Sequence, residues 1–213
     1  MQLKGNISQQ AIIVNVAKGI ENGTLDTMSE VISKETGHNT NYIVSVYGPS
    51  HAEEVGRKYP ATVVAACSDI DHARQVQELF SNQYFRVYSG SDVVGVEIGG
   101  SAKNIIALAA GACLGLGYGD NTMAALVTRG LEEIIRLGTT LGAQRSTFSG
   151  LAGMGDLIVT AFSPHSRNKQ VGERIGKGEK LNDILTSIEI LTQIYMEHNN
   201  CVLHCRSSLD NYP

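Results

Sequence analysis

The chain has 213 residues, of which 42% are hydrophobic and 18% are charged, and its formal net charge is −4. This is the composition of a globular protein with one large domain or two small ones. The balance of charge excludes the global basic field of a nucleic-acid-binding protein. The longest apolar runs are shorter than a membrane span, and Lys103 interrupts the most apolar helical pattern.

The beginning of the chain and its cysteines predict a reduced, cytoplasmic setting. The first five residues lead into a polar stretch, not into the apolar run of a signal peptide. Cys67 and Cys113 fall in apolar segments and are interpreted as core residues. A metal site is not expected, because four residues near the end match no standard zinc spacing. These are His198, Cys201, His204 and Cys205.

The first 91 residues alternate between short apolar segments and amphipathic ones. Strands are predicted over residues 11–16, 42–46, 62–66 and 85–88. Helices are predicted from a cap at Thr24 or Asp26 to about Glu35, over 51–58, and over 69–81 with Ser68 or Asp69 as the N-cap. Strands that alternate with helices indicate an α/β fold with a parallel, doubly wound sheet.

The pattern becomes helical after about Ser91, where we place a domain boundary. Five further helices are predicted, over residues 98–116, 122–141, 148–160, 167–175 and 181 to about 190. The strand–glycine-loop–helix unit that opens a dinucleotide-binding domain, with its Gly-x-Gly-x-x-Gly turn, is not found in this sequence. The chain is therefore expected to start within such a domain.

Lys103 is the most suggestive candidate for chemistry. It lies among Ile98, Ile105 and Ile106 on a predicted helix, where desolvation would lower the pKa of its ammonium group. A lysine with a lowered pKa can exchange a proton near neutral pH as a general acid or base. Asn104 beside it could bind a substrate oxygen. Taken alone, Lys103 is better explained as a lysine that snorkels from the helix to water.

Two other candidates follow predicted strands, where ligands bind in sheets of this kind. Lys18 comes directly after the first strand, although an ordinary solvated turn lysine would look the same. Gly48-Pro49-Ser50 comes after the second strand, and Ser50 offers a hydroxyl group. Helix capping alone would also account for Ser50.

The last candidates lie at two predicted helix starts. Asp156 follows Gly153-Met154-Gly155, whose glycines would allow a close backbone approach, and it could also serve as an N-cap. Ser166-Arg167-Asn168 opens a helix, where backbone N–H groups and the helix dipole favour an anion. Arg167 adds a guanidinium group suited to phosphate. The simpler alternative is a solvated basic helix face.

Six of these segments, in this order and spacing, resemble the bacterial NAD(P)-dependent glycerol-3-phosphate dehydrogenases over roughly residues 12–189. The resemblance implies a Rossmann domain followed by a helical domain of the 6-phosphogluconate-dehydrogenase type. It is carried by Lys18-Gly19-Ile20-Glu21, Gly48-Pro49-Ser50, Glu97 through Asn104, Gly117 through Asn121, Gly150 through Asp156, and Ser163-Pro164 with Ser166-Arg167-Asn168.

The resemblance also implies an activity and a set of site residues. The activity is the interconversion of dihydroxyacetone phosphate and sn-glycerol 3-phosphate with NAD or NADP, for glycerophospholipid synthesis. Lys103 would be the catalytic proton donor and acceptor, Asn104 and Thr160 would be supporting polar groups, and a homodimer is allowed. The substrate would contact Lys18, Gly48, Ser50, Lys103, Asp156, Ser166, Arg167 and Asn168. The cofactor would contact Lys18, Ala52 and Arg167.

The ends of the chain depart from that pattern and leave other functions open. We expect residues 1–91 to be the later portion of a Rossmann domain, 92–189 an incomplete helical catalytic domain, and 190–213 a divergent tail without the family's Val-x-Glu-Gly segment. The chain as given is expected to bind cofactor poorly and to be nearly inactive. The alternatives are an inactive or weakly phosphate-binding fragment, and a related dehydrogenase of 3-hydroxy acids or 6-phosphogluconate.

Overall fold

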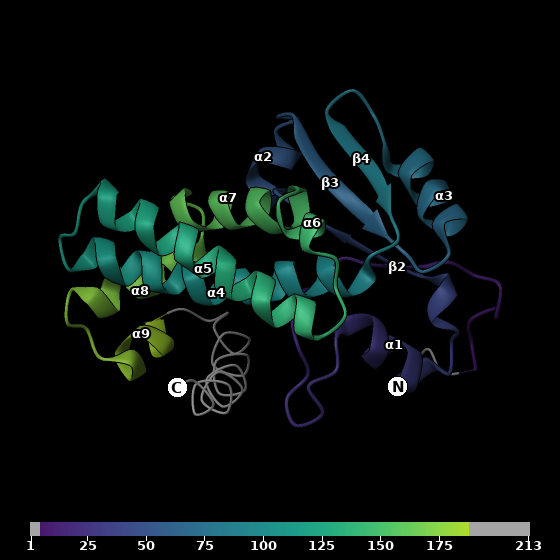
Figure 1. Ribbon diagram of the computed structural model, residues 1–213, viewed down its shortest axis with the longest axis horizontal. Helices are drawn as coiled ribbons and strands as arrows, with labels where there is room; N and C mark the ends of the chain where they lie inside the picture. Colours follow the sequence, from purple (N-terminus) through teal and green to yellow (C-terminus); the bar gives the residue numbers. More distant parts are fainter. Residues whose placement is uncertain (1–4, 188–213) are drawn as a thin grey trace.

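The computed structural model describes residues 5–187, which form a sheet with its helices and a larger helical part (Figure 1). All four predicted strands are present, in the order β1-β2-β3-β4. They are β1 Ile13–Asn15, β2 Ile43–Tyr47, β3 Ala61–Ala66 and β4 Phe85–Gly90. The α/β class and the later helical part are therefore confirmed.

The sheet is mixed, so the prediction that all its strands are parallel is wrong at one pair. β1 and β2 are parallel, with Ile13 opposite Ile43, and β3 and β4 are also parallel. β2 and β3 are antiparallel, with Tyr47 opposite Val64. Their connection holds only the short helix α2, Ala52–Gly56. Five helical residues rise about 8 Å, too little to return along a strand of about 16 Å.

Helices α1, Met28–Thr36, and α3, Ile70–Phe80, accompany the sheet (Figure 1). α3 covers one face, where its Ala73 and Val76 pack with strand residues such as Val63 and Val87 in a buried core. The predicted N-cap of α3 at Asp69 is confirmed, since its Oδ1 accepts a hydrogen bond of 3.0 Å from Asp71 N.

The predicted caps of α1 at Thr24 and Asp26 are wrong, and Thr27 is the N-cap. Thr27 forms a capping box with Glu30, whose Oε2 accepts a hydrogen bond of 2.8 Å from Thr27 N. A threonine with glutamate three positions later satisfies two helix-end groups at once, which explains why this residue is the N-cap.

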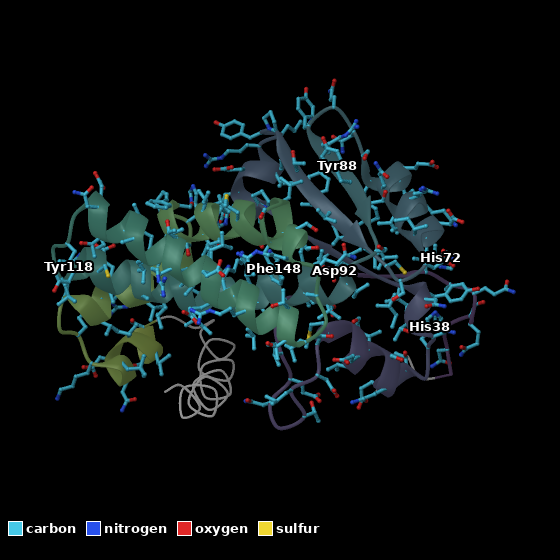
Figure 2. All side chains as sticks on the ribbon, viewed as in Figure 1. His38, His72, Tyr88, Asp92, Tyr118 and Phe148 are labelled. Atoms are coloured by element: carbon cyan, nitrogen blue, oxygen red, sulfur yellow. The ribbon has the colours of Figure 1, made fainter. Side chains whose placement is uncertain are left out.

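The helical part is built around α4, Val93–Gly115, which packs against α5, Asp120–Thr140, α7, Asp156–Phe162, and α8, Arg167–Gly176. α4 begins five residues earlier than predicted because Asp92 caps it, with its Oδ1 accepting from Gly95 N at 3.0 Å. Asp92 lies where the helical part meets the sheet (Figure 2). α4 is long and apolar enough for a bilayer, but 61% of its most apolar window is buried inside the protein.

The predicted helix over 148–160 is in fact three short elements. These are α6 Arg145–Phe148, a π-helical turn over Leu151–Gly155, and α7 Asp156–Phe162. The chain turns tightly at the break, and only glycine fits at position 153, because a Cβ there would lie 2.2 Å from the Phe148 carbonyl oxygen. The last two helices are α8 Arg167–Gly176 and α9 Leu181–Ser187.

Helices α4 and α8 approach backbone to backbone. A Cβ added at Gly111 would lie 1.9 Å from the Lys169 carbonyl oxygen, and one added at Gly172 would lie 1.9 Å from that of Leu108. Only glycine allows this distance, and the contact fixes the beginning of α8 alongside the middle of α4.

Candidate active site

Lys103 is buried at the centre of the helical part. The residue is 7% exposed, and its ammonium group donates to Asp156 Oδ1 and, at 2.8 Å, to Thr160 Oγ1. Asp156 and Thr160 are one turn apart on α7, so both side chains lie on the helix face toward Lys103. The snorkelling alternative is wrong, and Thr160 has the supporting contact that the sequence suggested.

Lys18 is the second cation at the same carboxylate. It follows β1, and its Nζ lies 2.6 Å from Asp156 Oδ2 and 5.5 Å from the centre of the Tyr47 ring. Its side chain keeps 24% of its surface exposed, against 2% for Asp156. One aspartate therefore bridges a buried lysine and a partly accessible one, and Lys18 is not an ordinary solvated turn residue.

The surroundings of Lys103 change its proton affinity. Together they lower the pKa of Lys103 to about 8, and burial is the largest cause. The charge of Asp156 acts in the opposite direction, and the neighbouring ammonium group of Lys18 acts in the same direction as burial. A lysine with this pKa can give or take a proton near neutral pH.

The π-helical turn over Leu151–Gly155 ends directly before Asp156 and sets where this residue enters α7. Gly155 is the N-cap of α7 and forms no side-chain cap bond, while Asp156 is the first helical residue. The capping alternative for Asp156 is therefore wrong. Both of its carboxylate oxygens accept hydrogen bonds from lysines.

The loop Gly48-Pro49-Ser50 lies beside the same helix start. β1 and β2 are parallel, so the loops after them leave the sheet at one edge. Gly48 has φ +152°, and a Cβ there would lie 2.8 Å from Val63 Cα. A Cβ at Gly155 would lie 3.7 Å from Pro49 Cδ, which places the loop next to the start of α7.

Ser50 and Ala52 lead from this loop into α2. The capping explanation for Ser50 is wrong, because His51 is the N-cap and Ser50 Oγ donates to the Gly48 carbonyl at 3.2 Å. Ala52 is the first residue of α2 and is exposed. Both residues therefore lie at the edge of the sheet from which Lys18 also emerges.

The beginning of α8 closes the site on its other side. Ser166 is 3% exposed and caps the helix, accepting a hydrogen bond of 3.3 Å from Lys169 N. Arg167 is exposed. Within residues 5–187, Asn168 Oδ1 is buried and has no hydrogen-bond partner. A helix N-terminus with an exposed guanidinium group suits an anion, and the unpartnered amide oxygen of Asn168 suits a hydrogen-bond donor.

The start of α8 also adjoins the start of α2. The rings of His51 and His165 are 6.1 Å apart between centroids, and His51 Nε2 is a second buried atom without a partner in the described part of the chain. A hydrogen bond to its own backbone lowers the pKa of Glu53, and the charges of His165, His51 and Arg167 lower it further.

Sequence reasoning missed two residues that hold Lys18 in place. Ser101 Oγ accepts a hydrogen bond of 3.1 Å from Gly19 N, and the Tyr47 hydroxyl group donates to the Ala17 carbonyl. Ser101 could have been found, because it lies one helical turn after Glu97 on an otherwise apolar helix. Tyr47 gave no signal, since a buried strand tyrosine looks like ordinary core.

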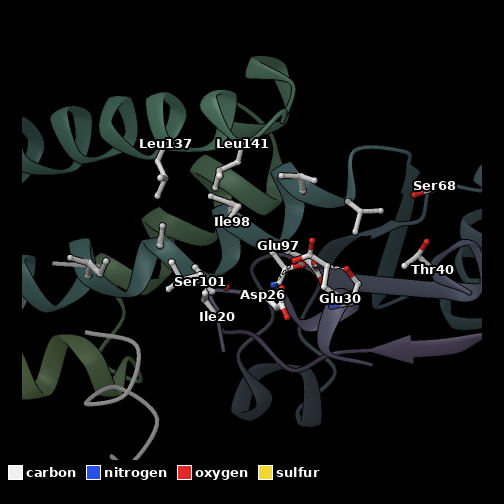
Figure 3. A pocket seen from close by; sticks show the side chains of 17 residues that line it. Ile20, Asp26, Glu30, Thr40, Ser68, Glu97, Ile98, Ser101, Leu137 and Leu141 are labelled. Carbon is white, nitrogen blue, oxygen red and sulfur yellow. Dashed lines mark hydrogen bonds between the residues drawn. The ribbon is translucent and has the colours of Figure 1, made fainter. Parts of the chain in front are cut away.

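A mostly apolar cavity of about 470 Å³ lies beside α4, apart from this site (Figure 3). Its lining includes Ile98, Ser101 and Leu137 but neither Lys103 nor Asp156. No group of three or more metal-ligating side chains occurs among residues 5–187. The cysteines and histidines over 198–205 lie outside the described residues.

Two family models match the chain. The NAD-dependent glycerol-3-phosphate dehydrogenase C-terminus matches residues 92–202, and the N-terminus of the same family matches residues 1–73. A glycerol-3-phosphate dehydrogenase [NAD(P)+] of Lysinibacillus sphaericus is 51% identical over 193 residues, which cover 90% of this chain and 57% of that protein. A second relative, from Salinibacter ruber, is 54% identical over 182 residues, which cover 85% of this chain and 53% of that protein. The chain thus spans little more than half of these relatives.

Solved structures of glycerol-3-phosphate dehydrogenases also match the chain. The crystal structure of glycerol-3-phosphate dehydrogenase from Coxiella burnetii matches with a TM-score of 0.86 at 35% identity, covering 96% of this chain and 63% of that one. The structure of glycerol-3-phosphate dehydrogenase from Saccharomyces cerevisiae matches with a TM-score of 0.77 at 27% identity, covering 94% of this chain and 62% of that one.

Proposed function

Because the chain belongs to the NAD-dependent glycerol-3-phosphate dehydrogenase family, we propose that its protein interconverts dihydroxyacetone phosphate and sn-glycerol 3-phosphate. The observation that supports this best is the arrangement of Lys103, Asp156 and Lys18 beside the start of α8. It combines a proton donor of suitable pKa with a place for an anion. The product would serve glycerophospholipid synthesis.

Lys103 has the central role in this proposal. In the reducing direction, NAD(P)H when bound supplies the hydride to the carbonyl carbon. The Lys103 ammonium group then gives its proton to the carbonyl oxygen, which becomes the hydroxyl group. In the oxidising direction, neutral Lys103 takes that proton back. Asp156 keeps the amine aimed at the substrate and, with Thr160, holds it in a dry environment.

The remaining residues bind and orient. Lys18 is the partly exposed cation and would contact both substrate and nicotinamide, while Gly48 and Ser50 line the substrate pocket. Ser166, Arg167 and Asn168 would bind the phosphate group. The unpartnered Asn168 Oδ1 would accept a hydrogen bond from a substrate hydroxyl group.

The residues present at the edge of the sheet fit a nicotinamide cofactor in part. Lys18 and Arg167 supply positive charge, Ala52 offers an exposed, small surface, and His51 Nε2 is a buried polar atom that still lacks a partner. We assign Lys18, Ala52 and Arg167 to the cofactor. The preference between NAD and NADP is left open.

The wider assignments follow from the family. We propose a Rossmann portion over residues 1–91, a helical catalytic portion over 92–189 and a divergent segment over 190–213. We further propose a cytoplasmic protein that has small-molecule substrates, binds no nucleic acid and is able to form a homodimer. The two relatives from Lysinibacillus sphaericus and Salinibacter ruber are named glycerol-3-phosphate dehydrogenases, and they do not favour the alternatives of a 3-hydroxy acid or 6-phosphogluconate dehydrogenase or of an inactive fragment.

Turnover tests the proposal directly. The absorbance of reduced nicotinamide is followed with dihydroxyacetone phosphate, with unphosphorylated dihydroxyacetone, and with a 3-hydroxy acid and 6-phosphogluconate in the reverse direction. In a protein that carries this chain together with the parts of the relatives that it does not cover, we expect turnover with the phosphorylated ketone and a loss of roughly hundredfold or more in kcat for Lys103→Ala. The matched control is Lys34→Ala, which removes an exposed, ion-paired lysine. Full activity of Lys103→Ala would sink the proposed mechanism.

A further inference from the structure

A second buried carboxylate lies on α4, and the proposed chemistry does not use it. Glu97 is 1% exposed (Figure 3). Its oxygens accept hydrogen bonds from Ser29 N at 2.9 Å, Ser29 Oγ at 2.7 Å, Ser45 Oγ at 2.6 Å and Asn15 Nδ2 at 3.5 Å. The ion pairs found among residues 5–187 do not include it. Four donors from α1, β1 and β2 thus converge on one acidic group.

These hydrogen bonds have a fixed direction. Ser45 gives its proton to Glu97 and therefore accepts from Asn15 Nδ2, at 3.3 Å. The same Asn15 amide nitrogen donates to the Tyr47 hydroxyl group at 3.2 Å. With its NH₂ group turned toward these acceptors, Asn15 presents its Oδ1 to Ala17 N, at 3.0 Å.

The network ends on the segment that carries Lys18. Both backbone groups of Ala17 are bonded, its N–H to Asn15 and its carbonyl to the Tyr47 hydroxyl group. On the other side of Lys18, Gly19 N donates to Ser101 Oγ at 3.1 Å. Ser101 and Glu97 are on the same helix as Lys103. One rigid helix therefore fixes both lysines that meet at Asp156.

We propose that Glu97 is a positioning residue that holds Lys18 against Asp156 through Asn15 and Tyr47. This rests on the proposed function for its effect on turnover. A residue that only fills the core would lower stability without a particular relation to Lys18. A positioning residue loses its effect on catalysis when Lys18 is absent, because nothing remains for it to position.

A double-mutant cycle separates these two roles. Glu97→Gln puts an NH₂ group among donors, so at least one of the four hydrogen bonds must break or reverse its direction. We expect kcat/KM for dihydroxyacetone phosphate to fall roughly tenfold to hundredfold when Lys18 is present, and by less than about twofold in a Lys18→Met background. Equal losses in both backgrounds would overturn the proposal.

Two further variants distinguish a loss of Lys18 positioning from a general loss of stability. Tyr47→Phe removes the bond to the Ala17 carbonyl without touching the carboxylate, and we expect the same dependence on Lys18. Val87→Ala is the control, since it enlarges the sheet core away from this network. It should lower the melting temperature yet lose activity by the same factor with and without Lys18. A Lys18 dependence in Val87→Ala would overturn the proposal.

Nitrogen-15 NMR of the lysine ammonium groups tests the proposal without turnover. Lys18→Met assigns the Lys18 signal by its disappearance. In Glu97→Gln, we expect that signal to move toward the position of a free lysine, and the Lys103 signal to shift less, because Lys103 keeps its own hydrogen bonds to Asp156 and Thr160. An unmoved Lys18 signal would overturn the proposal. If the unaltered protein failed to reduce dihydroxyacetone phosphate, the proposed function would fall, and this measurement would still decide the role of Glu97.

Discussion

Asp156 binds two ammonium groups at once, and the three residues determine one another's properties. Burial favours the neutral amine of Lys103 and lowers its pKa, whereas the charge of Asp156 favours the ammonium form and partly offsets this effect. Lys18 shares that carboxylate and adds a positive charge nearby, which lowers the pKa of Lys103. The proton affinity of Lys103 therefore depends on a residue from a distant part of the chain.

The pKa of Lys103 and its dependence on Lys18 predict how turnover changes with pH. Reduction needs the Lys103 ammonium group, so kcat/KM for dihydroxyacetone phosphate should fall as the pH rises through about 8. Oxidation of glycerol 3-phosphate needs the neutral amine and should rise over the same range. Lys18→Met removes a charge that lowers this pKa, so the inflection should move to higher pH in both directions.

The control for this prediction is Lys34→Met, which breaks the ion pair that the exposed Lys34 of α1 forms with Asp26. It should leave the inflection where it is. An inflection that stays in place in Lys18→Met would show that the two ammonium groups are not coupled.

Candidate residues of the site could be singled out from the sequence, but the mutual arrangement that the structure gives them could not. Lys103 and Asp156 were recognisable because a lysine in an apolar helix and an aspartate after glycines need a reason. Their ion pair could not be derived, since it joins α4 to α7 across a long stretch of sequence. Glu97 and Tyr47 were given no role from the sequence, because buried hydrogen-bond partners leave no local pattern.

At the scale of elements, local signals gave the strands and most helices, and failures occurred where tertiary packing overrode them. The helix pattern over 148–160 continues through Gly153, yet the chain forms a π-helical turn there, so tight that a Cβ at Gly153 would lie 2.2 Å from the Phe148 carbonyl oxygen. The antiparallel pairing of β2 and β3 likewise follows from the short α2 between them. Alternating hydrophobicity does not report strand direction.

The contact between α4 and α8 supports a prediction at this scale. Gly172→Ala would place a Cβ 1.9 Å from the Leu108 carbonyl oxygen, so the two helices must separate. We expect the free energy of unfolding to fall by about 1–3 kcal/mol. Phosphate binding should weaken as well, because α8 begins with Ser166, Arg167 and Asn168. Chemical denaturation and phosphate titration measure the two effects.

The matched control is Gly56→Ala, at a helical position where an added Cβ meets nothing within 4 Å. It should be neutral or stabilising by up to about 1 kcal/mol, as expected for alanine in place of helical glycine. Equal destabilisation by both substitutions would show that the close helix contact is not what Gly172 provides.

At the scale of the whole molecule, the sheet and the helical part share a core. Tyr47 and Ala66 from the sheet pack with Val96 of α4 and Ala152 of the π-helical turn. The buried hydrogen bonds of Glu97 join the same two parts. Separating them would expose this apolar surface and leave several polar groups unpaired.

We therefore expect the two parts to unfold together. The most protected amides of β3, such as Val63, and of α4, such as Ala107, should exchange hydrogen with the same free energy and the same denaturant dependence. Val63→Ala, a change confined to the sheet core, should lower the protection of both by an equal amount, about 0.5–3 kcal/mol. Protection in α4 that survives this substitution would show two independent units, and the site between them would then form only when they dock.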